Sequence, residues 1–407
     1  MTVEILSIGN ELLAGHTINT NAAAIAQALL PHGITIDRVT LLPDEKSDLK
    51  EGIKEAMGRS SFIITTGGLG PTGDDLTRDI IAEVCGTSLV HDENVANDLI
   101  KRFGPELSTL EDQSMVLKGA TIIPNPIGTA PGFILKGKTT FFILPGVPSQ
   151  MEVMLTEVVS YLKEHCTQKH YIEPLYLCLL AEQEVDPYLR LLEKEHSGVE
   201  IGICPGYGIL SIYLHAKDPK LFPPVREKIE EKFRTYIYSR ADKQIELAIQ
   251  KWMVKNKKTF AAGESCSGGH LAAILTSHAG ASDYFLGSIV SYSNHLKETA
   301  LGVAPGTLET HGAVSKETVI EMAYGVQKLT GADYVITLSG IAGPSGGTLD
   351  KPVGTVWGAI ATPDRIFSGL LPIKHSAKKR PLVIEYSVTF LLASLWRFLN
   401  HKIEPFS

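Results

Sequence analysis

The sequence predicts an α/β protein built on largely parallel sheets, and three observations lead to this fold class. Apolar segments of strand length alternate with segments of helix length at both ends of the chain. Glycine-rich loops follow several of the apolar segments, as is common at the carboxyl ends of parallel strands. With 407 residues, the chain is also too long for a single hydrophobic core, so two or three domains are expected.

The composition and charge of the chain narrow the class of protein. Hydrophobic residues make up 44% and charged residues 20%, values typical of a folded globular protein. The net charge of −7 argues against binding of nucleic acid by the whole chain, although a local basic patch would escape this test. The five cysteines include no CxxC pair and their number is odd, which favours a reducing, cytoplasmic setting without a disulfide framework or a zinc ribbon.

Neither a signal peptide nor a membrane span is expected. The chain begins MTVEILSIGNELLAG, in which Glu4 interrupts the apolar run and no basic region precedes it, so this stretch predicts a strand. No uninterrupted run of 18 apolar residues occurs, so no membrane partner is expected.

The first part of the chain, residues 1–165, is predicted to form one domain. Its expected elements are a strand at Val3–Gly9, a helix at Asn21–Leu30, a strand at Ile34–Leu42, a helix at Lys46–Met57, a strand at Ser61–Gly68, a buried strand within Thr139–Met151 and a helix to about Lys163. This order predicts a parallel sheet with helices on both faces. Ligands of such sheets bind outside the carboxyl ends of the strands.

A small α+β module is predicted at residues 170–242. The polar segment Lys163–Pro174 contains a proline and is expected to be the linker that precedes it. A strand is expected at Ile209–Ala216 and a charged helix from about Pro224 to Thr235, and a second boundary lies near Arg240–Ile245. We find no chemical motif in this module.

The last part, residues 245–407, again alternates helices and strands and is predicted to be a further α/β domain. Its expected elements are a helix at Ile245–Val254, strands within Thr259–Ser265, Phe285–Ser293, Asp333–Gly340 and Val353–Thr362, and a terminal helix at Leu382–Phe398. The terminal helix has apolar residues at helical spacing.

The segment TTGGLGPTGDD, Thr65–Asp75, is the first candidate site. Backbone N–H groups of a glycine-rich loop can approach a phosphate closely. The candidate phosphate loop consists of Gly67, Gly68, Gly70, Thr72 and Gly73. Asp74 and Asp75 would repel a bare phosphate, and this conflict is removed if a divalent cation lies between them. The alternative is that one carboxylate caps a helix and the glycines serve a tight turn.

Polar residues also follow two other strands of the first domain. Glu11 lies in the loop Gly9–Asn21, and Asp44 follows the strand that ends at Leu42. Each is more often a cap or turn residue when taken alone. Several such loops in one sheet favour a shared site, so we take Asp74, Asp75, Glu11 and Asp44 as candidate metal ligands.

The segment AAGESCSGGH, Ala261–His270, predicts a strand, a tight turn and a helix. Its serines form GxSxS, close to the hydrolase pattern GxSxG, and a nucleophile at a helix N-terminus has a lowered pKa. The alternative is a set of caps with a phosphate-binding turn. No histidine or asparagine pattern supports Cys266 as a catalytic thiol. The candidate substrate-binding residues of this turn are Ser265, Cys266, Ser267, Gly268 and Gly269.

Two more segments of the last domain carry candidate residues. The loop Thr337–Thr355 is glycine-rich and lacks paired acids, which fits an oxyanion hole, a phosphate cradle or a long surface turn. Its candidate substrate-binding residues are Gly343, Gly346 and Gly347. Ser282 precedes a predicted strand and Lys297 follows it. A serine–lysine pair needs no histidine, but Lys297 fits a solvated helix position equally well.

The motifs of the first domain resemble those of one known family. GNELLAG, TTGGLGPTGDD, IGTAPGF and LPGVPSQM are similar to the N-terminal domain of the competence/damage-inducible protein family, CinA. That domain resembles the molybdopterin-binding fold. The resemblance implies either pterin binding or a divalent-metal-dependent ADP-ribose pyrophosphatase. Gln150 replaces the acidic residue of the family pattern PGVPxEM, which weakens the second implication if that acid is functional.

The motifs of the last domain resemble the C-terminal domain of the same family and nicotinamide mononucleotide (NMN) amidohydrolases. They are ESCSGG, GASDYFLGSIVSYSN with the following lysine, ETHGAVS, SGIAGPSGG and KPVGTVW. The resemblance implies that Ser282 is the nucleophile and Lys297 the general base, with Tyr292 and Ser339 as supporting hydroxyls. The late arginine of the family falls at Arg380, in a segment HSAKKRP that departs from the usual GDR-containing pattern.

We therefore expect a cytoplasmic enzyme of pyridine-nucleotide salvage. The last domain would hydrolyse the amide of NMN to nicotinate mononucleotide and ammonia without a cofactor, with Ser265 binding substrate and Ser282 attacking. The first domain would cleave ADP-ribose with a divalent metal. The middle module falls where the family has a KH-like domain, and a homodimer is expected. The alternatives are a pterin-cofactor carrier without catalysis and an adaptor in DNA uptake or repair.

Overall fold

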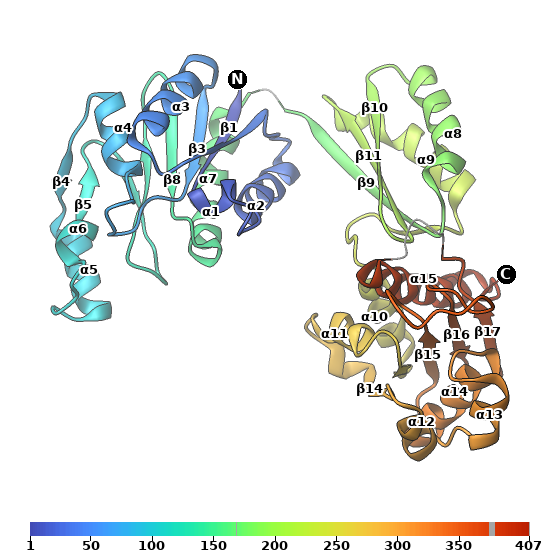
Figure 1. Cartoon of the computed structure of the whole chain (residues 1–407). Helices are drawn as coiled ribbons and strands as arrows, with labels where there is room; N and C mark the ends of the chain where they lie inside the picture. Colours follow the sequence, from blue (N-terminus) through green and yellow to red (C-terminus); the bar gives the residue numbers. More distant parts are fainter. Residues whose placement is uncertain (168, 374–378, 407) are drawn as a thin grey trace. The chain divides into compact units, whose positions relative to one another are not determined.

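The structure is a computed structural model that describes residues 1–167, 169–373 and 379–406. It has the mixed α/β fold class that the sequence predicts. The chain forms two compact units, Met1–Ile172 with Lys217–Pro219 and Glu173–Ala216 with Lys220–Ser407. Figure 1 shows the elements of each unit, coloured from blue at the N-terminus to red at the C-terminus.

A six-stranded sheet in the order β2-β1-β3-β8-β7-β6 is the centre of the first unit. Its strands are β1 (Val3–Ile8), β2 (Arg38–Leu42), β3 (Phe62–Thr66), β8 (Thr140–Leu144), β7 (Gly132–Leu135) and β6 (Thr121–Ile123). The first four pair in parallel, whereas β7 and β6 are antiparallel additions at one side. The carboxyl ends of β1, β2, β3 and β8 therefore meet at one edge of this sheet.

Helices cover both faces of this sheet, as predicted. Ile5 and Phe142 pack on one face with α2 (Thr20–Leu29) and α7 (Pro148–His165). Leu6 and Phe141 point to the other face, where α3 (Lys46–Arg59) and α4 (Thr77–Cys85) pack. Burial on both faces explains why these strands are continuous apolar runs rather than alternating ones. A small side layer contains β4 (Leu89–His91), α5 (Glu93–Phe103), α6 (Leu110–Gln113) and β5 (Met115–Leu117).

The predicted linker Lys163–Pro174 is wrong in its second half. Helix α7 continues to His165, and strand β9 (Tyr171–Cys178) begins before Pro174. β9 belongs to a four-stranded sheet in the order β10-β11-β9-β12. The other elements of this module are α8 (Glu182–Glu195), β10 (Val199–Pro205), β11 (Ile209–Ala216), α9 (Phe222–Phe233) and β12 (Ile237–Ser239). Strand β10 was not predicted from the sequence.

The last part of the chain has a five-stranded sheet in the order β14-β13-β15-β16-β17. Its strands are β13 (Phe260–Glu264), β14 (Phe285–Val290), β15 (Tyr334–Gly340), β16 (Val356–Ala361) and β17 (Ile366–Leu370), of which β17 was not predicted. β13 pairs in parallel with both β14 and β15, whereas β16 and β17 run antiparallel. The carboxyl ends of β14, β13 and β15 therefore lie side by side.

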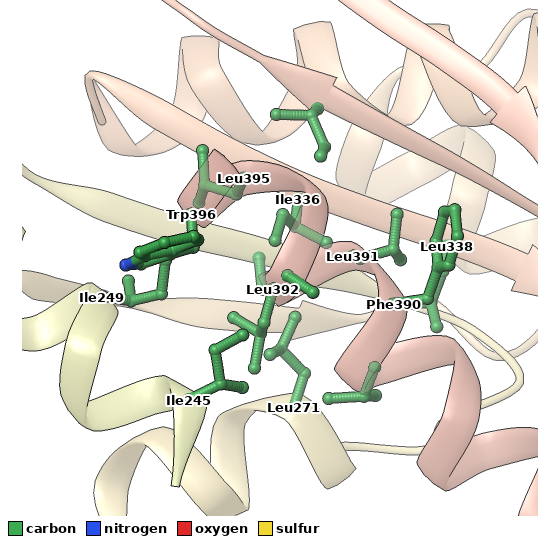
Figure 2. Close-up of a cluster of buried hydrophobic side chains, with 14 of the residues drawn as sticks. Ile245, Ile249, Leu271, Ile336, Leu338, Phe390, Leu391, Leu392, Leu395 and Trp396 are labelled. Atoms are coloured by element: carbon green, nitrogen blue, oxygen red, sulfur yellow. The ribbon is translucent and has the colours of Figure 1, made fainter. Parts of the chain in front are cut away.

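Helix α15 (Arg380–His401) forms the main core of this sheet with α10 (Ile245–Asn256) and α11 (His270–Thr276). Figure 2 shows Leu391, Leu392 and Trp396 of α15 among side chains of the neighbouring helices and strands. On the other face, α14 (Lys316–Thr330) packs beside α12 (Asn294–Leu301) and α13 (Pro305–His311). Within the described residues, α15 alone is long and apolar enough to cross a membrane, but 67% of its apolar window is buried inside the protein. Such burial is typical of a core helix.

Candidate active sites

A buried lysine lies at the edge of the five-stranded sheet where the parallel strands β14, β13 and β15 end. Lys297 is in α12, which begins where the hydroxyl of Ser293 accepts a hydrogen bond from the N–H of Leu296. Only 1% of Lys297 is exposed. Its Nζ lies 2.9 Å from Oγ of Ser265 and 2.8 Å from the carbonyl oxygen of Ser291. Burial lowers the pKa of Lys297, against a smaller opposing effect of Cys266. A larger share of neutral amine than in a solvated lysine is therefore expected at this position.

Ser265 is held in place by the central strands of the sheet. It follows β13, and its N–H donates to the carbonyl of Leu338 on β15 at 3.1 Å. The carbonyl of Ser265 accepts from the N–H of Gly268 at 3.1 Å, which closes the turn. Ser265 is 7% exposed. A serine hydroxyl within hydrogen-bond distance of a buried lysine is the arrangement required for activation by a general base.

Ser282 is not the serine that contacts Lys297. It lies in a short 3₁₀ turn, Ala281–Asp283, at the start of β14, and it is exposed. Lys297 follows the other end of β14, a strand of six residues. Six residues of β-strand span about 20 Å, and a serine–lysine hydrogen bond cannot cross that distance. The expectation that Lys297 takes a proton from Ser282 therefore does not fit the geometry of this chain.

Arg380 and Tyr292 lie within hydrogen-bond distance of each other. Arg380 is the first residue of α15, and its guanidinium donates to Oη of Tyr292 at 2.9 Å. A second bond, of 3.1 Å, joins the guanidinium to the carbonyl of Gly343 in the glycine-rich loop. The charges of Arg380 and Lys297 both act on Cys266, which places the two cations around the same turn. Residues 375–378 of the HSAKKRP segment lie outside the described residues.

Of the remaining residues of the ESCSGG turn, Cys266 and Ser267 are buried, whereas Gly268 is exposed. Burial raises the pKa of Cys266 to about 12, so its thiol is not a reactive thiolate. The hydroxyl of Ser267 donates to the carboxylate of Glu264 at 2.8 Å. Gly268 and Gly269 have φ angles of 62° and 100°, the left-handed backbone that favours glycine. These glycines shape the turn between β13 and α11.

The N-terminus of α11 is not open to a substrate phosphate, which corrects a prediction from the sequence. The carboxylate of Glu264 accepts hydrogen bonds from the N–H groups of Gly269, Leu271 and Ala272, at 3.1, 3.0 and 3.0 Å. These are the donors that a bound phosphate would use. Glu264 was not predicted as a site residue, although an acid directly before a helix-forming turn is a capping signal.

The second glycine-rich loop, Thr337–Thr355, is closed by a hydrogen bond at its base and is exposed at its tip. The N–H of Ile341 donates to the carbonyl of Thr355 at 2.8 Å. A Cβ on Gly347 would lie 2.7 Å from the backbone nitrogen of Val353, so this position requires glycine. Gly346 has a φ of 89°.

Ser339 lies on β15, before the glycines of this loop, and is 1% exposed, with its hydroxyl donating to the carbonyl of Ala313 at 2.7 Å. Ser339 therefore supports the neighbouring segment.

In the first unit, the glycines of Thr65–Asp75 are required by close packing. Gly67 has a φ of 110°, and a Cβ there would lie 2.2 Å from the carbonyl oxygen of Ile8 at the end of β1. A Cβ on Gly68 would lie 2.2 Å from Oγ1 of Thr77, which itself donates to the carbonyl of Gly67 at 2.9 Å. The loop is thereby pressed against β1 and the start of α4.

The acids of this loop bond within the loop and do not cap α4. Asp75 accepts from the N–H of Thr72 at 3.0 Å, and the Thr72 hydroxyl lies within hydrogen-bond distance of both Asp74 and Asp75, to one of which it can donate. Helix α4 begins after Leu76 without a side-chain cap. A Cβ on Gly70 would lie 2.4 Å from Oδ2 of Asp75, so this glycine makes room for the carboxylate.

The predicted metal ligands lie near one another without forming a ligand cluster. Asp44 accepts from the N–H of Asn10 at 2.9 Å. Burial raises the pKa of Asp44, and the charges of Glu11, Asp74 and Asp75 raise it further. Nevertheless, no group of three or more His, Cys, Asp or Glu side chains in the described ranges is arranged to hold a metal ion. As they lie, these four side chains do not fit a metal-ion site.

Gln150 occupies a structural position at the start of α7. Its Oε1 accepts a hydrogen bond from Nδ2 of Asn125 at 2.8 Å. Oδ1 of Asn125 in turn accepts from the N–H of Gly128 at 2.8 Å. Gln150 thus holds the IGTAPGF segment through an acceptor oxygen, a contact that a glutamate at the same position would also provide. Asn21, at the end of the predicted polar loop Gly9–Asn21, donates to Oγ1 of Thr66 and to the carbonyl of Gly146, each at 2.7 Å.

Fold and sites together define a two-unit α/β protein with polar loops gathered at the carboxyl ends of parallel strands in each unit. The model of a probable molybdopterin binding domain matches residues 4–164, and that of the CinA C-terminal domain matches residues 242–399. The chain is 40% identical over 391 residues to a competence-damage inducible protein of Thermoanaerobacter sp. (strain X514), covering 93% of this chain and 94% of that protein. This chain belongs to the CinA family.

Other relatives cover similar or smaller parts of the chain. A CinA-like protein of Prochlorococcus marinus (strain MIT 9515) is 35% identical over 416 residues, which cover 98% of this chain and 96% of that protein. The crystal structure of the competence damage-inducible protein A from Klebsiella pneumoniae is 32% identical, with a TM-score of 0.37, and covers 39% of this chain and 96% of that one.

Proposed function

We propose that the last domain hydrolyses the amide of NMN to nicotinate mononucleotide and ammonia by a serine–lysine mechanism. The observation that carries this proposal is the 2.9 Å contact between the buried Nζ of Lys297 and Oγ of Ser265. The similarity of the motifs around these residues to those of NMN amidohydrolases supplies the substrate. The lowered pKa of Lys297 supports its role as the base.

The reaction follows from the positions of these two groups. Neutral Lys297 takes the proton of the Ser265 hydroxyl as Oγ attacks the amide carbon, and the protonated amine then gives this proton to the amide nitrogen, which leaves as ammonia when the C–N bond breaks. Water hydrolyses the resulting acyl ester, with Lys297 again the base. The backbone N–H groups of Cys266 and Ser267 follow the nucleophile directly and are our candidates for the oxyanion hole.

We assign the phosphate of the substrate to Arg380 and the glycine-rich loop. Because Glu264 already occupies the start of α11, the phosphate needs other donors. Arg380 is fixed between Tyr292 and Gly343, and a guanidinium suits a phosphate because it offers paired donors. The tip of the loop, with Gly346 and Gly347, supplies backbone N–H groups next to it.

Steady-state kinetics of ammonia release from NMN test the choice of nucleophile. Ser265→Ala is expected to lower kcat by several orders of magnitude, whereas Ser282→Ala, at the opposite end of β14, should keep kcat within about tenfold. Loss of turnover in Ser282→Ala with a functional Ser265→Ala would return the role of nucleophile to Ser282. Absence of ammonia release from NMN by the wild type would refute the proposed substrate.

A second candidate function, cleavage of ADP-ribose to AMP and ribose 5-phosphate, concerns the first unit. The specific observation is that Asp44, Glu11, Asp74 and Asp75 lie close enough for their charges to raise the pKa of Asp44. Such mutual repulsion is relieved when a cation binds. The side chains do not form a ligand set as they lie, so we derive no catalytic step through a metal. Incubation with ADP-ribose with and without Mg²⁺, followed by chromatography of the products, tests this function.

A further inference from the structure

A fully buried carboxylate, that of Glu264, lies directly beside the proposed nucleophile. Glu264 is the last residue of β13 and has no exposed surface. Its Oε2 accepts hydrogen bonds from the hydroxyl of Ser267 at 2.8 Å and from the N–H groups of Gly269 at 3.1 Å and Leu271 at 3.0 Å. These bonds fix the turn in which Ser265 lies.

Glu264 also forms hydrogen bonds with strand β14 and with Ser291, the residue after it, whose carbonyl contacts Lys297. Oε1 of Glu264 accepts from the hydroxyl of Ser288 on β14 at 2.8 Å and from the N–H of Ala272 at 3.0 Å. The main-chain carbonyl of Glu264 accepts from the N–H of Ser291 at 2.8 Å. The carbonyl of Ser291 in turn accepts from Nζ of Lys297. Glu264 therefore connects the turn of the nucleophile with the strand end that holds the base.

A side chain that offers two acceptor oxygens is needed to satisfy all the donors around this position. Five donors point at its two oxygens, three of them N–H groups at the start of α11. An amide side chain would direct its own N–H₂ group at some of these donors. Hydrogen bonds to a charged acceptor are also about twice as strong as those between neutral groups. A glutamine here would leave buried donors unpaired and let the turn move.

We propose that Glu264 is a positioning residue, which holds Ser265 and Lys297 at hydrogen-bond distance and occupies the helix start in place of a substrate phosphate. This inference rests on the proposed serine–lysine mechanism and names what keeps its two groups aligned. Because Glu264 contacts neither Oγ of Ser265 nor Nζ of Lys297 through its side chain, its removal should affect turnover rather than binding.

Kinetics of three variants of the full-length protein test this role. Glu264→Gln is expected to lower kcat for NMN at least about tenfold, with KM within about twofold, because binding groups stay in place. Ser288→Ala removes a single donor, should lower kcat by about two- to fivefold, and keeps the test possible if Glu264→Gln does not fold. The matched control is Glu246→Gln: Glu246 bonds His278 at 3.0 Å elsewhere in the domain, and its kcat should stay within about twofold of wild type.

Labelling with a fluorophosphonate probe separates this inference from the choice of substrate. We expect the probe to modify Ser265 in the wild type, located by peptide mass spectrometry, and to react at least about tenfold more slowly with Glu264→Gln. Labelling of Ser265 without hydrolysis of NMN would refute NMN as the substrate. The ratio of the labelling rates of wild type and Glu264→Gln would still measure the positioning of Ser265. A folded Glu264→Gln variant with wild-type kcat and labelling rate would overturn the inference. So would losses of equal size in Glu246→Gln, or labelling at another serine.

Discussion

Burial of a single lysine gives the C-terminal site its chemistry. Lys297 is surrounded by protein on an α-helix that would otherwise present its lysines to water, and the bonds that it makes are to a hydroxyl and a carbonyl rather than to a carboxylate. A carboxylate partner would hold the lysine protonated, whereas neutral partners and burial favour the free amine. The sequence placed Lys297 after a strand but could not show whether it was buried, because that depends on how α12 packs on the sheet.

The pH dependence of NMN deamidation should report the state of this lysine. Because burial lowers the pKa of Lys297 below its ordinary value of 10.5, the neutral base should form at lower pH than in a solvated lysine. We expect kcat/KM to rise with pH and to reach its plateau below about pH 10.5. At Lys297 itself the unfolded chain binds more protons than the native one in this range, so the contribution of this one group to stability should rise with pH. Initial rates of ammonia release at a series of pH values measure this rising limb of the kcat/KM profile.

The matched control for this profile is Lys297→Arg. Arginine keeps a positive charge at all accessible pH values and cannot act as the base. Its residual activity should lack the rising limb. A limb that persists unchanged in Lys297→Arg would assign it to another group and remove the support for Lys297 as the base.

At the scale of elements, periodicity predicted most helices and strands, whereas the contacts that bring the site together are non-local. The parallel strands β1, β3 and β13 were found because continuous apolar runs mark strands buried on both faces. Strand β10, of sequence VEIGICP, was not predicted because its burial pattern is irregular. Its strand conformation depends on pairing with β11, which the local sequence does not show. The pairing of Ser265 with Lys297 joins residues 32 positions apart, and spacing alone cannot reveal such a contact.

Two glycines of one loop should respond differently to the same substitution. In Gly67→Ala the new Cβ would lie 2.2 Å from a backbone oxygen of β1, at a φ of 110° that alanine disfavours. We expect a loss of about 2–4 kcal/mol in the free energy of unfolding. Gly73→Ala in the same loop meets nothing within 4 Å and should change stability by less than about 0.5 kcal/mol. Urea unfolding of the full chain, followed by hydrogen exchange of β1 peptides, measures both.

The outcome of this pair separates packing from ligand binding as the reason for the glycines. Equal, small effects on stability in both variants would mean that the loop relaxes around Gly67. The glycines would then serve mainly to let a ligand approach the backbone.

At the scale of the whole molecule, the two units share one feature of their architecture. In each, parallel strands end at a common edge, and the glycine-rich loops that follow them carry the candidate residues. This placement follows from the fold class and could be predicted from the sequence. The side chains differ between the edges: the first gathers carboxylates around Asp44, whereas the second places Lys297 and Arg380 around Cys266. These different side chains argue for two sites with different ligands.

The two activities should therefore be lost independently. Asp75→Asn removes a carboxylate from the first unit and is expected to lower ADP-ribose cleavage at least about tenfold while NMN deamidation stays within about twofold. Ser265→Ala should have the reverse effect, because no element is shared between the two sheets. A chelator should likewise leave ammonia release unchanged, since the proposed serine–lysine reaction involves no metal ion. Both rates can be measured on the same full-length preparations by chromatography of the products. Parallel loss of both activities in a folded Asp75→Asn variant would mean that the substrates share one site.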